Sequence, residues 1–154
     1  MKEPPRYQPH FIYLREIIAS IASWLGYPND YDKPLALVKS LFSTICQSFP
    51  FSKVVQLFAA LPQPLQALTV EQWKIDQFLP DPIHTLSDFL DEIVASDPNL
   101  FPANATGKEL AQSTLFATMK VISNHVSPDD MQQIIRIFPD DAQERIHTFI
   151  LLNT

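Results

Sequence analysis

The chain has 154 residues, of which 46% are hydrophobic and 18% charged, so it fits one ordinary domain or two very small ones and is too apolar to be disordered. Glycine occurs only at Gly26 and Gly107, which excludes a glycine-rich phosphate loop and argues against a many-stranded β fold. Residues 1–80 carry seven Lys or Arg and six Asp or Glu (+1), whereas residues 81–154 carry four and eleven (−7), so nucleic acid is not an expected partner.

Helical periodicity runs through the first half of the chain. Apolar residues recur every three or four positions in four stripes, over residues 11–25, 35–49, 54–61 and 65–70. Gly26 follows the first stripe and prolines follow the second and third, and both residue types commonly end helices. The spacing therefore predicts three helices and a short fourth helical segment.

The second half repeats this order after a stiff Pro-Asp-Pro connection. Helix starts are predicted at Thr85, at a capping box formed by Thr106 and Glu109, and at Ser127, which precedes a proline and two aspartates. No segment shows the alternation expected of a strand. The apolar stripes of this half cover residues 86–93, 110–126, 131–138 and 146–150.

The two halves also resemble each other in detail. Their first stripes match at an offset of 72 residues, and their second and third stripes match at an offset of 77. The difference of five is one insertion between residues 97 and 105. We therefore predict an all-α helical bundle built from two tandem, similar units of three to four helices, over residues 11–76 and 85–152. In this scheme residues 11–154 are a single domain, and residues 1–10 are a flexible N-terminal segment.

The two units are expected to share one core, because a unit of about 65–75 residues supplies little net stability alone. Several helices also carry adjacent apolar residues. Such neighbours point about 100° apart, so both are buried only when the helix is flanked on two sides. These pairs are Ile17–Ile18, Val54–Val55 and Ile134–Ile135.

No membrane or export segment is expected. The first ten residues contain three prolines and no apolar run, unlike a signal peptide. No stretch of about 18 apolar residues occurs anywhere in the chain. We therefore expect a cytoplasmic protein without membrane insertion.

Three features of the sequence follow one another in a recognisable order. They are the first stripe from Leu14 to Gly26, the run Leu57-Phe58-Ala59-Ala60-Leu61-Pro62, and Trp73. This order resembles a bacterial family of uncharacterised helical proteins known as domain of unknown function 2267. The second half departs from the family's closing Leu-Pro pair, with Phe138-Pro139 in its place. The likeness covers residues 11–150. The resemblance implies a helical architecture and assigns no activity to any residue.

Glu144 and His147 form a Glu-x-x-His pair, the spacing found in carboxylate-bridged di-iron sites. Such a site needs a second pair, and none of the other five Glu is followed three residues later by His. His84 and His125 are isolated, and the single Cys46 lies in an apolar stripe, where a buried inert thiol is expected. The sequence thus predicts no catalytic residue, no cofactor site and no metal site.

Two other residue types were considered as candidates. The acidic pairs Asp129–Asp130 and Asp140–Asp141 begin predicted helices, where carboxylates stabilise the N-terminus without doing chemistry. Trp24 and Trp73 end helical segments, and Trp is enriched at protein interfaces. Trp73 is expected to fill the seam between the halves, with a docking strip over residues 70–75 as the alternative.

Three functions remain open on the sequence. The first is a non-catalytic interaction or structural module, with a protein partner or self-association. The alternative is a bundle that holds a lipid-like or aromatic molecule between the halves, since eleven Phe, two Trp and three Met could form its walls. The third is an enzyme with no recognisable motif, which the absence of a nucleophile–base pair disfavours.

Overall fold

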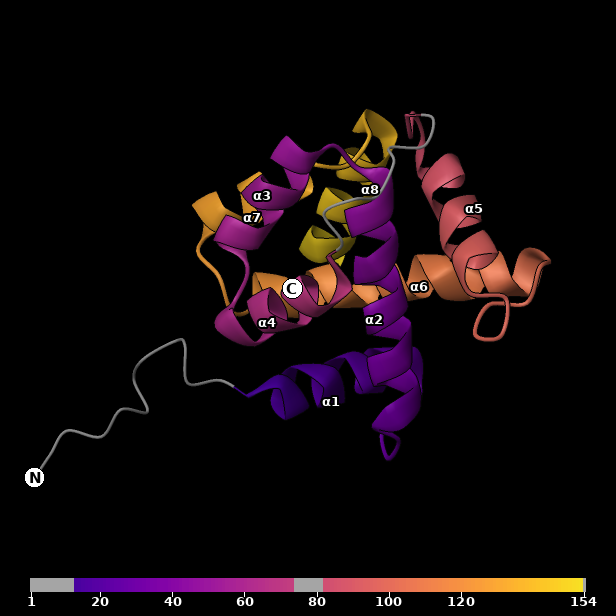
Figure 1. Cartoon of the computed structure of the whole chain (residues 1–154). Coiled ribbons are helices and arrows are strands. Elements are labelled where there is room, and N and C mark those ends of the chain that lie inside the picture. The colour runs from indigo at the N-terminus through magenta and orange to yellow at the C-terminus, as the bar shows by residue number, and fades with distance from the viewer. Residues whose placement is uncertain (1–12, 74–81, 154) are drawn as a thin grey trace, which may run out of the picture.

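The computed structural model describes residues 13–73 and 82–153 (Figure 1). Over these residues the regular structure is helical, without β-strands, which confirms the predicted all-α class. The expectation of a flexible segment over residues 1–10, and part of the strip over residues 70–75, lie outside the described residues. The helices are α1 (Leu14–Leu25), α2 (Asp32–Ser48), α3 (Phe51–Ala60), α4 (Gln63–Gln72), α5 (Leu86–Ser96), α6 (Ala105–Ser123), α7 (Pro128–Ile135) and α8 (Asp140–Leu152).

Glycine and proline separate the helices as predicted. Gly26 follows α1 with a φ of 86°, in the left-handed region that glycine adopts without strain. Prolines occupy the N-cap positions of α3, α4 and α8, where a missing N–H costs no helical hydrogen bond. Short turns that contain a glycine or a proline therefore connect these helices.

The side-chain caps of α5 and α7 are those predicted. The Thr85 hydroxyl accepts a hydrogen bond from the Asp88 N–H at 3.0 Å, and the Ser127 hydroxyl accepts one from the Asp130 N–H at 3.1 Å. Both caps satisfy an N–H that has no partner inside its own helix.

The predicted capping box at Thr106 is wrong. The N-cap of α6 is Asn104, whose side-chain oxygen accepts a hydrogen bond from the Gly107 N–H at 3.1 Å. Thr106 lies inside the first turn. Gly107, in the same turn, packs against Pro102 so closely that an added Cβ would stand 1.7 Å from the Pro102 carbonyl oxygen. Only a residue without a side chain fits this position.

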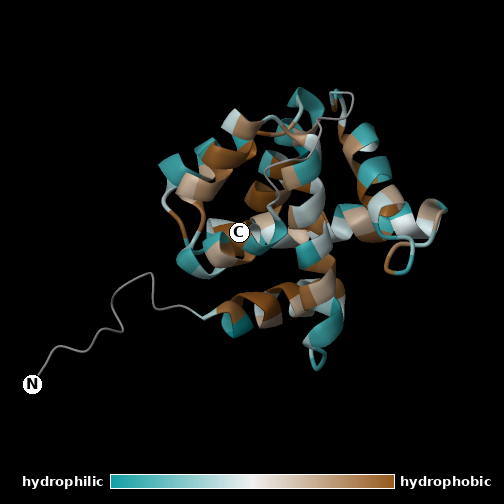
Figure 2. Cartoon of the chain, in the orientation of Figure 1, coloured by the Kyte–Doolittle hydropathy of each residue, from teal (hydrophilic) through white to brown (hydrophobic). Residues whose placement is uncertain are grey.

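One cluster of buried apolar side chains includes residues from every one of these helices. Its largest members include Phe42, Phe89, Phe101 and Phe138, which are fully enclosed. Hydrophobic residues lie along the sides that the helices turn toward one another (Figure 2). Burial of this apolar surface is the main term that stabilises the fold.

Two of the three adjacent apolar pairs are buried on both members, namely Ile17–Ile18 and Ile134–Ile135. The third prediction is wrong at one residue, because Val55 is 41% exposed while Val54 is buried. α3 lies at the edge of the molecule and packs mainly on α7, so its outer face has no neighbour to cover Val55.

α2 and α6 cross at the centre of the molecule, and the other helices pack around them (Figure 1). α1 contacts α6 more extensively than it contacts α2, and α5 packs on both α2 and α6. α4 lies on α2 as α8 lies on α6, and α3 pairs with α7. If α1 to α4 are exchanged with α5 to α8 in order, each of these packing pairs becomes another pair that is also present.

Hydrogen bonds also join the two halves. The Gln56 side-chain amide donates to the Gln133 carbonyl at 2.9 Å, and the Lys53 ammonium donates to the Ile137 carbonyl at 3.3 Å. The Asp141 carboxylate accepts from the Leu86 N–H at 2.9 and 3.2 Å. These bonds hold α3 against α7 and the start of α5 against the start of α8.

Candidate functional site

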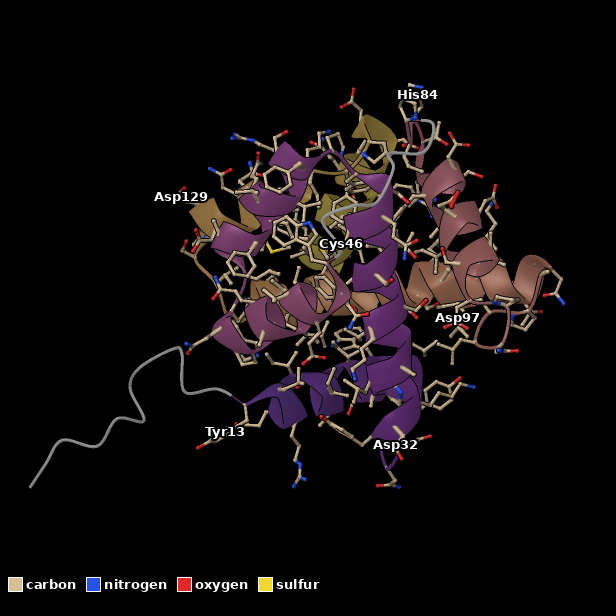
Figure 3. All side chains as sticks on the ribbon, in the orientation of Figure 1. Tyr13, Asp32, Cys46, His84, Asp97 and Asp129 are labelled. Carbon is tan, nitrogen blue, oxygen red and sulfur yellow. The ribbon has the colours of Figure 1, made fainter. Side chains whose placement is uncertain are left out.

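The titratable residues considered from the sequence do not converge. Asp129 and His84 lie at separate edges of the molecule, whereas Cys46 lies in its interior (Figure 3). Glu144 and His147 are both exposed on α8. Within residues 13–73 and 82–153, no group of three or more His, Cys, Asp or Glu is placed to hold a metal ion.

Cys46 is buried, as predicted, and its burial raises the pKa of the thiol to about 11. Its sulfur lies 4.0 Å from the Thr69 carbonyl oxygen, which it contacts as a weak donor from α2 to α4. A thiol with this pKa is protonated at neutral pH, so Cys46 has the properties of a structural residue rather than a nucleophile.

The two tryptophans differ in their surroundings. Trp24 is 43% exposed and meets the Phe149 ring edge-on at 5.8 Å between centroids. Trp73 is half-buried, and its ring lies 5.3 Å from that of Phe51 at the start of α3. This contact lies within the first half of the chain, so the expected place in the seam stays a prediction.

Three helices form a hollow in the described part of the chain that could bind a small ligand. A groove of about 450 Å³, which we call the C-terminal groove, lies between the end of α6, α7 and the end of α8. This volume falls within the range of about 300–1,000 Å³ that is usual for small-molecule sites. Its lining residues are Lys120, Ser123, Asn124, Val126, Pro128, Met131, Gln132, Ile135, His147, Ile150 and Leu151.

Lys120 is the unusual member of this lining. It is only 7% exposed, although lysine is rarely buried without a partner. Among the described residues, an ion pair joins Lys108 and Asp91, and none involves Lys120. No described side chain or carbonyl accepts a hydrogen bond from the Lys120 ammonium. The ammonium is not among the fully buried side-chain atoms that lack a hydrogen-bond partner, and Lys120 lines the groove.

The composition of the C-terminal groove differs from that of the half in which it lies. Residues 81–154 carry eleven acidic side chains, yet none of them lines the groove. The charged or titratable members are Lys120 and His147. The groove is therefore apolar with a cation, inside an acidic half of the molecule.

A wider hollow of about 720 Å³ lies between the α3–α4 turn and the α6–α7 turn. It contains half-buried His125, whose pKa burial lowers against an opposing effect of the Glu16 carboxylate. Its lining also includes Asp130 and several amides, and it holds no buried charge. We therefore take the C-terminal groove, not this hollow, as the candidate site.

A model of the family described as uncharacterized conserved protein (DUF2267) matches residues 14–144. The chain belongs to the DUF2267 family. The match confirms the resemblance found in the sequence and runs from the first residue of α1 into α8. No curated protein matches the chain. The DUF2267 match covers α6 and α7, whereas three lining residues of the groove, His147, Ile150 and Leu151, follow its end.

Sequence reasoning missed both Lys120 and the groove of this DUF2267 protein. The expected pocket lay between the halves with Phe and Trp in its walls, whereas the groove lies within the C-terminal half and no Phe or Trp lines it. A signal was present in the sequence. Every residue from 114 to 122 in α6 is buried, and all are apolar or small except Lys120. A lone cation in such a segment indicates a site.

None of the helices in the described parts of the chain is both long and apolar enough to span a membrane.

Proposed function

We propose that this DUF2267 protein is a non-catalytic helical bundle that binds a small apolar molecule in the C-terminal groove. The observation that carries this proposal is the apolar groove of about 450 Å³ between α6, α7 and α8. Each buried methylene group of a ligand contributes about 0.8 kcal/mol, so an alkyl chain laid along Met131 and Ile135 would bind through its apolar surface.

The experiment is a titration of ¹⁵N-labelled protein with 1-dodecanol, followed by the chemical shifts of backbone amides. We expect saturable shifts at the end of α6, in α7 and at the end of α8. Ile150→Trp fills the groove and should abolish these shifts, whereas Thr148→Trp adds the same bulk at an exposed position of α8 outside the lining. Shifts scattered over the whole surface, or unchanged in Ile150→Trp, would contradict the proposal.

We also infer that the fold is a tandem repeat, with units over residues 11–76 and 85–152 in one domain. The exchange symmetry of the helix packing supports this inference. The helix starts support it as well, because α3 and α7 begin 77 residues apart at Phe51 and Pro128, and α4 and α8 begin 77 residues apart at Gln63 and Asp140. The hydrogen bond from Gln56 to the Gln133 carbonyl joins equivalent positions.

The repeat offers a reason for the groove. At the offset of 77, Phe51 corresponds to Pro128, and Trp73 corresponds to Ile150. The rings of Phe51 and Trp73 are in contact in the first half. The second half has smaller side chains at both positions, which leaves space between α7 and α8.

A second candidate function is self-association through the surface beside the groove. Trp24 and Leu152 are 43% and 79% exposed, and Phe149, which contacts Trp24, precedes Leu152 by three positions on the same helix face. Exposed apolar side chains gathered in this way are typical of contact surfaces.

We also propose a cytoplasmic location, which is consistent with the reduced, buried Cys46.

Sedimentation over a range of protein concentrations tests self-association. We expect a dimer that Leu152→Glu dissociates, while Val70→Glu, a change at another exposed apolar residue (54%), leaves it intact. A monomer at every concentration would remove this second candidate and leave the groove as the functional feature.

A further inference from the structure

We propose that the C-terminal groove selects a single-chain alkyl carboxylate and that Lys120 binds its head group. This inference rests on the proposed function and adds the chemical class of the ligand. The juxtaposition that carries it is a lysine that is 7% exposed, has no hydrogen-bond or ion-pair partner for its ammonium among the described residues, and lines a groove whose lining includes no carboxylate.

Burial of Lys120 is costly without an anion. A charged group removed from water loses hydration that only an opposite charge or hydrogen bonds replace. The described residues supply neither to the Lys120 ammonium. A ligand carboxylate in the groove would supply both, through the short, charge-assisted bonds that ammonium and carboxylate groups form.

A role at the helix end does not account for Lys120. It lies in the last turn of α6, where a cation can offset the helix dipole. However, three of the last four carbonyls of α6 already accept hydrogen bonds. The Lys120 carbonyl accepts from the Ser123 hydroxyl at 2.6 Å, and the next two carbonyls accept from the Asn124 and His125 N–H groups at 3.1 and 2.9 Å. The ammonium is therefore available to a ligand.

The remaining lining defines the rest of the ligand. The lining also includes apolar side chains such as Val126, Met131 and Ile135. Its other polar members are Ser123, Asn124, Gln132 and His147. No Phe, Tyr or Trp lines the groove, and the imidazole of His147 is the one aromatic ring among its lining residues. The volume of about 450 Å³ lies toward the lower end of the range for small-molecule sites, which favours one alkyl chain over a two-chain lipid.

The test is calorimetric titration of the full chain with three probes of equal chain length. These are dodecanoate, neutral 1-dodecanol and cationic dodecyltrimethylammonium. The two ionic probes are kept below their micelle concentrations and the neutral one below its solubility limit. We expect dodecanoate to bind most tightly, by about tenfold over 1-dodecanol, which corresponds to about 1.4 kcal/mol. The cationic probe should bind least. This ranking is measured on the unmodified protein, so it does not depend on the folding of any variant.

Lys120→Met removes the charge and keeps most of the side-chain volume. It should lower dodecanoate affinity at least about tenfold and change 1-dodecanol affinity less than about twofold, because only the carboxylate interacts with the ammonium. Lys108→Met is the matched control on the same helix, since Lys108 lies outside the groove and pairs with Asp91. It should leave both affinities unchanged.

Two results would overturn the inference, and each is distinct from failure of the proposed function. Equal binding of dodecanoate and 1-dodecanol would keep the groove as an apolar site and remove the carboxylate. A lower unfolding midpoint in Lys120→Met, with dodecanoate affinity unchanged, would assign Lys120 to the helix dipole alone. If neither dodecanoate nor 1-dodecanol perturbs α6, α7 and α8, the proposed function itself fails.

Discussion

Gly107 illustrates how closely the first turn of a helix can approach the segment before it. It lies at the third position of α6, and an added Cβ would stand 1.7 Å from the Pro102 carbonyl oxygen. We expect Gly107→Ala to lower the free energy of unfolding by about 2 kcal/mol, because overpacking outweighs the gain of about 1 kcal/mol in helix propensity. Urea unfolding measures this difference.

Gly26→Ala is the matched control for Gly107→Ala. Nothing lies within 4 Å of a Cβ added at Gly26, but its φ of 86° strains any other residue, which costs about 1 kcal/mol. The smaller loss in this variant comes from backbone conformation alone. A Gly107→Ala protein as stable as the parent would show that the approach to Pro102 is not tight.

His125 should make the stability of the protein depend on pH. Burial lowers the pKa of this residue below its ordinary value of 6.5, and Glu16 opposes the effect. The unfolded chain therefore binds the proton more readily, so the contribution of His125 is present above pH 6.5 and is lost as the pH falls through the lowered pKa.

Urea unfolding of wild type and His125→Gln at about pH 7.5 and about pH 5 measures this linkage. We expect the free energy of unfolding to fall less toward acid in His125→Gln than in the wild type. His147→Gln, a change at an exposed residue, should keep the wild-type slope. Identical slopes in all three proteins would contradict the assignment to His125.

At the scale of helices, Asp141 joins the starts of α8 and α5 through its bond to the Leu86 N–H. We expect Asp141→Ala to lower the free energy of unfolding by about 1–2 kcal/mol, through loss of a charge-assisted hydrogen bond. Asp140 also stabilises the N-terminus of α8 through the helix dipole, but it does not bond to Leu86. Asp140→Ala should therefore lower the free energy of unfolding by less than about 1 kcal/mol. Equal losses in thermal or urea unfolding would show that the bond across the helices contributes nothing.

Most helices were predictable because their signals are local. The period of apolar residues and the positions of Gly26 and three prolines predicted the order of the helices and most of their ends. The start of α6 was missed because its N-cap is Asn104, which the spacing of Thr106 and Glu109 does not reveal.

The candidate site was not predictable in the same way. The C-terminal groove arises where the ends of three helices meet, so it depends on the bulk of side chains that are distant in sequence, such as Lys120 and Ile150. The apolar stripe predicted for α6 indicated one buried face. In the structure the middle of the helix is buried on all sides. The sequence shows a lone lysine in this segment, but its place in a groove is visible only once α7 and α8 are placed.

At the scale of the whole molecule, the packing makes each half dependent on the other. α1 lies on α6 rather than mainly on α2, and α5 lies across α2, so separation of the halves would expose the buried faces of both central helices. A chain of about 75 residues with that much apolar surface uncovered has little net stability. The proposed tandem repeat is thus an interdependent pair.

Separate expression of residues 1–81 and 82–154 tests this dependence directly. Circular dichroism during urea titration should show that each half alone unfolds gradually and without a cooperative transition. Mixing the two in equal amounts should restore both helicity and a cooperative transition close to that of the intact chain. A cooperative transition in either half alone, as a monomer, would contradict a shared core.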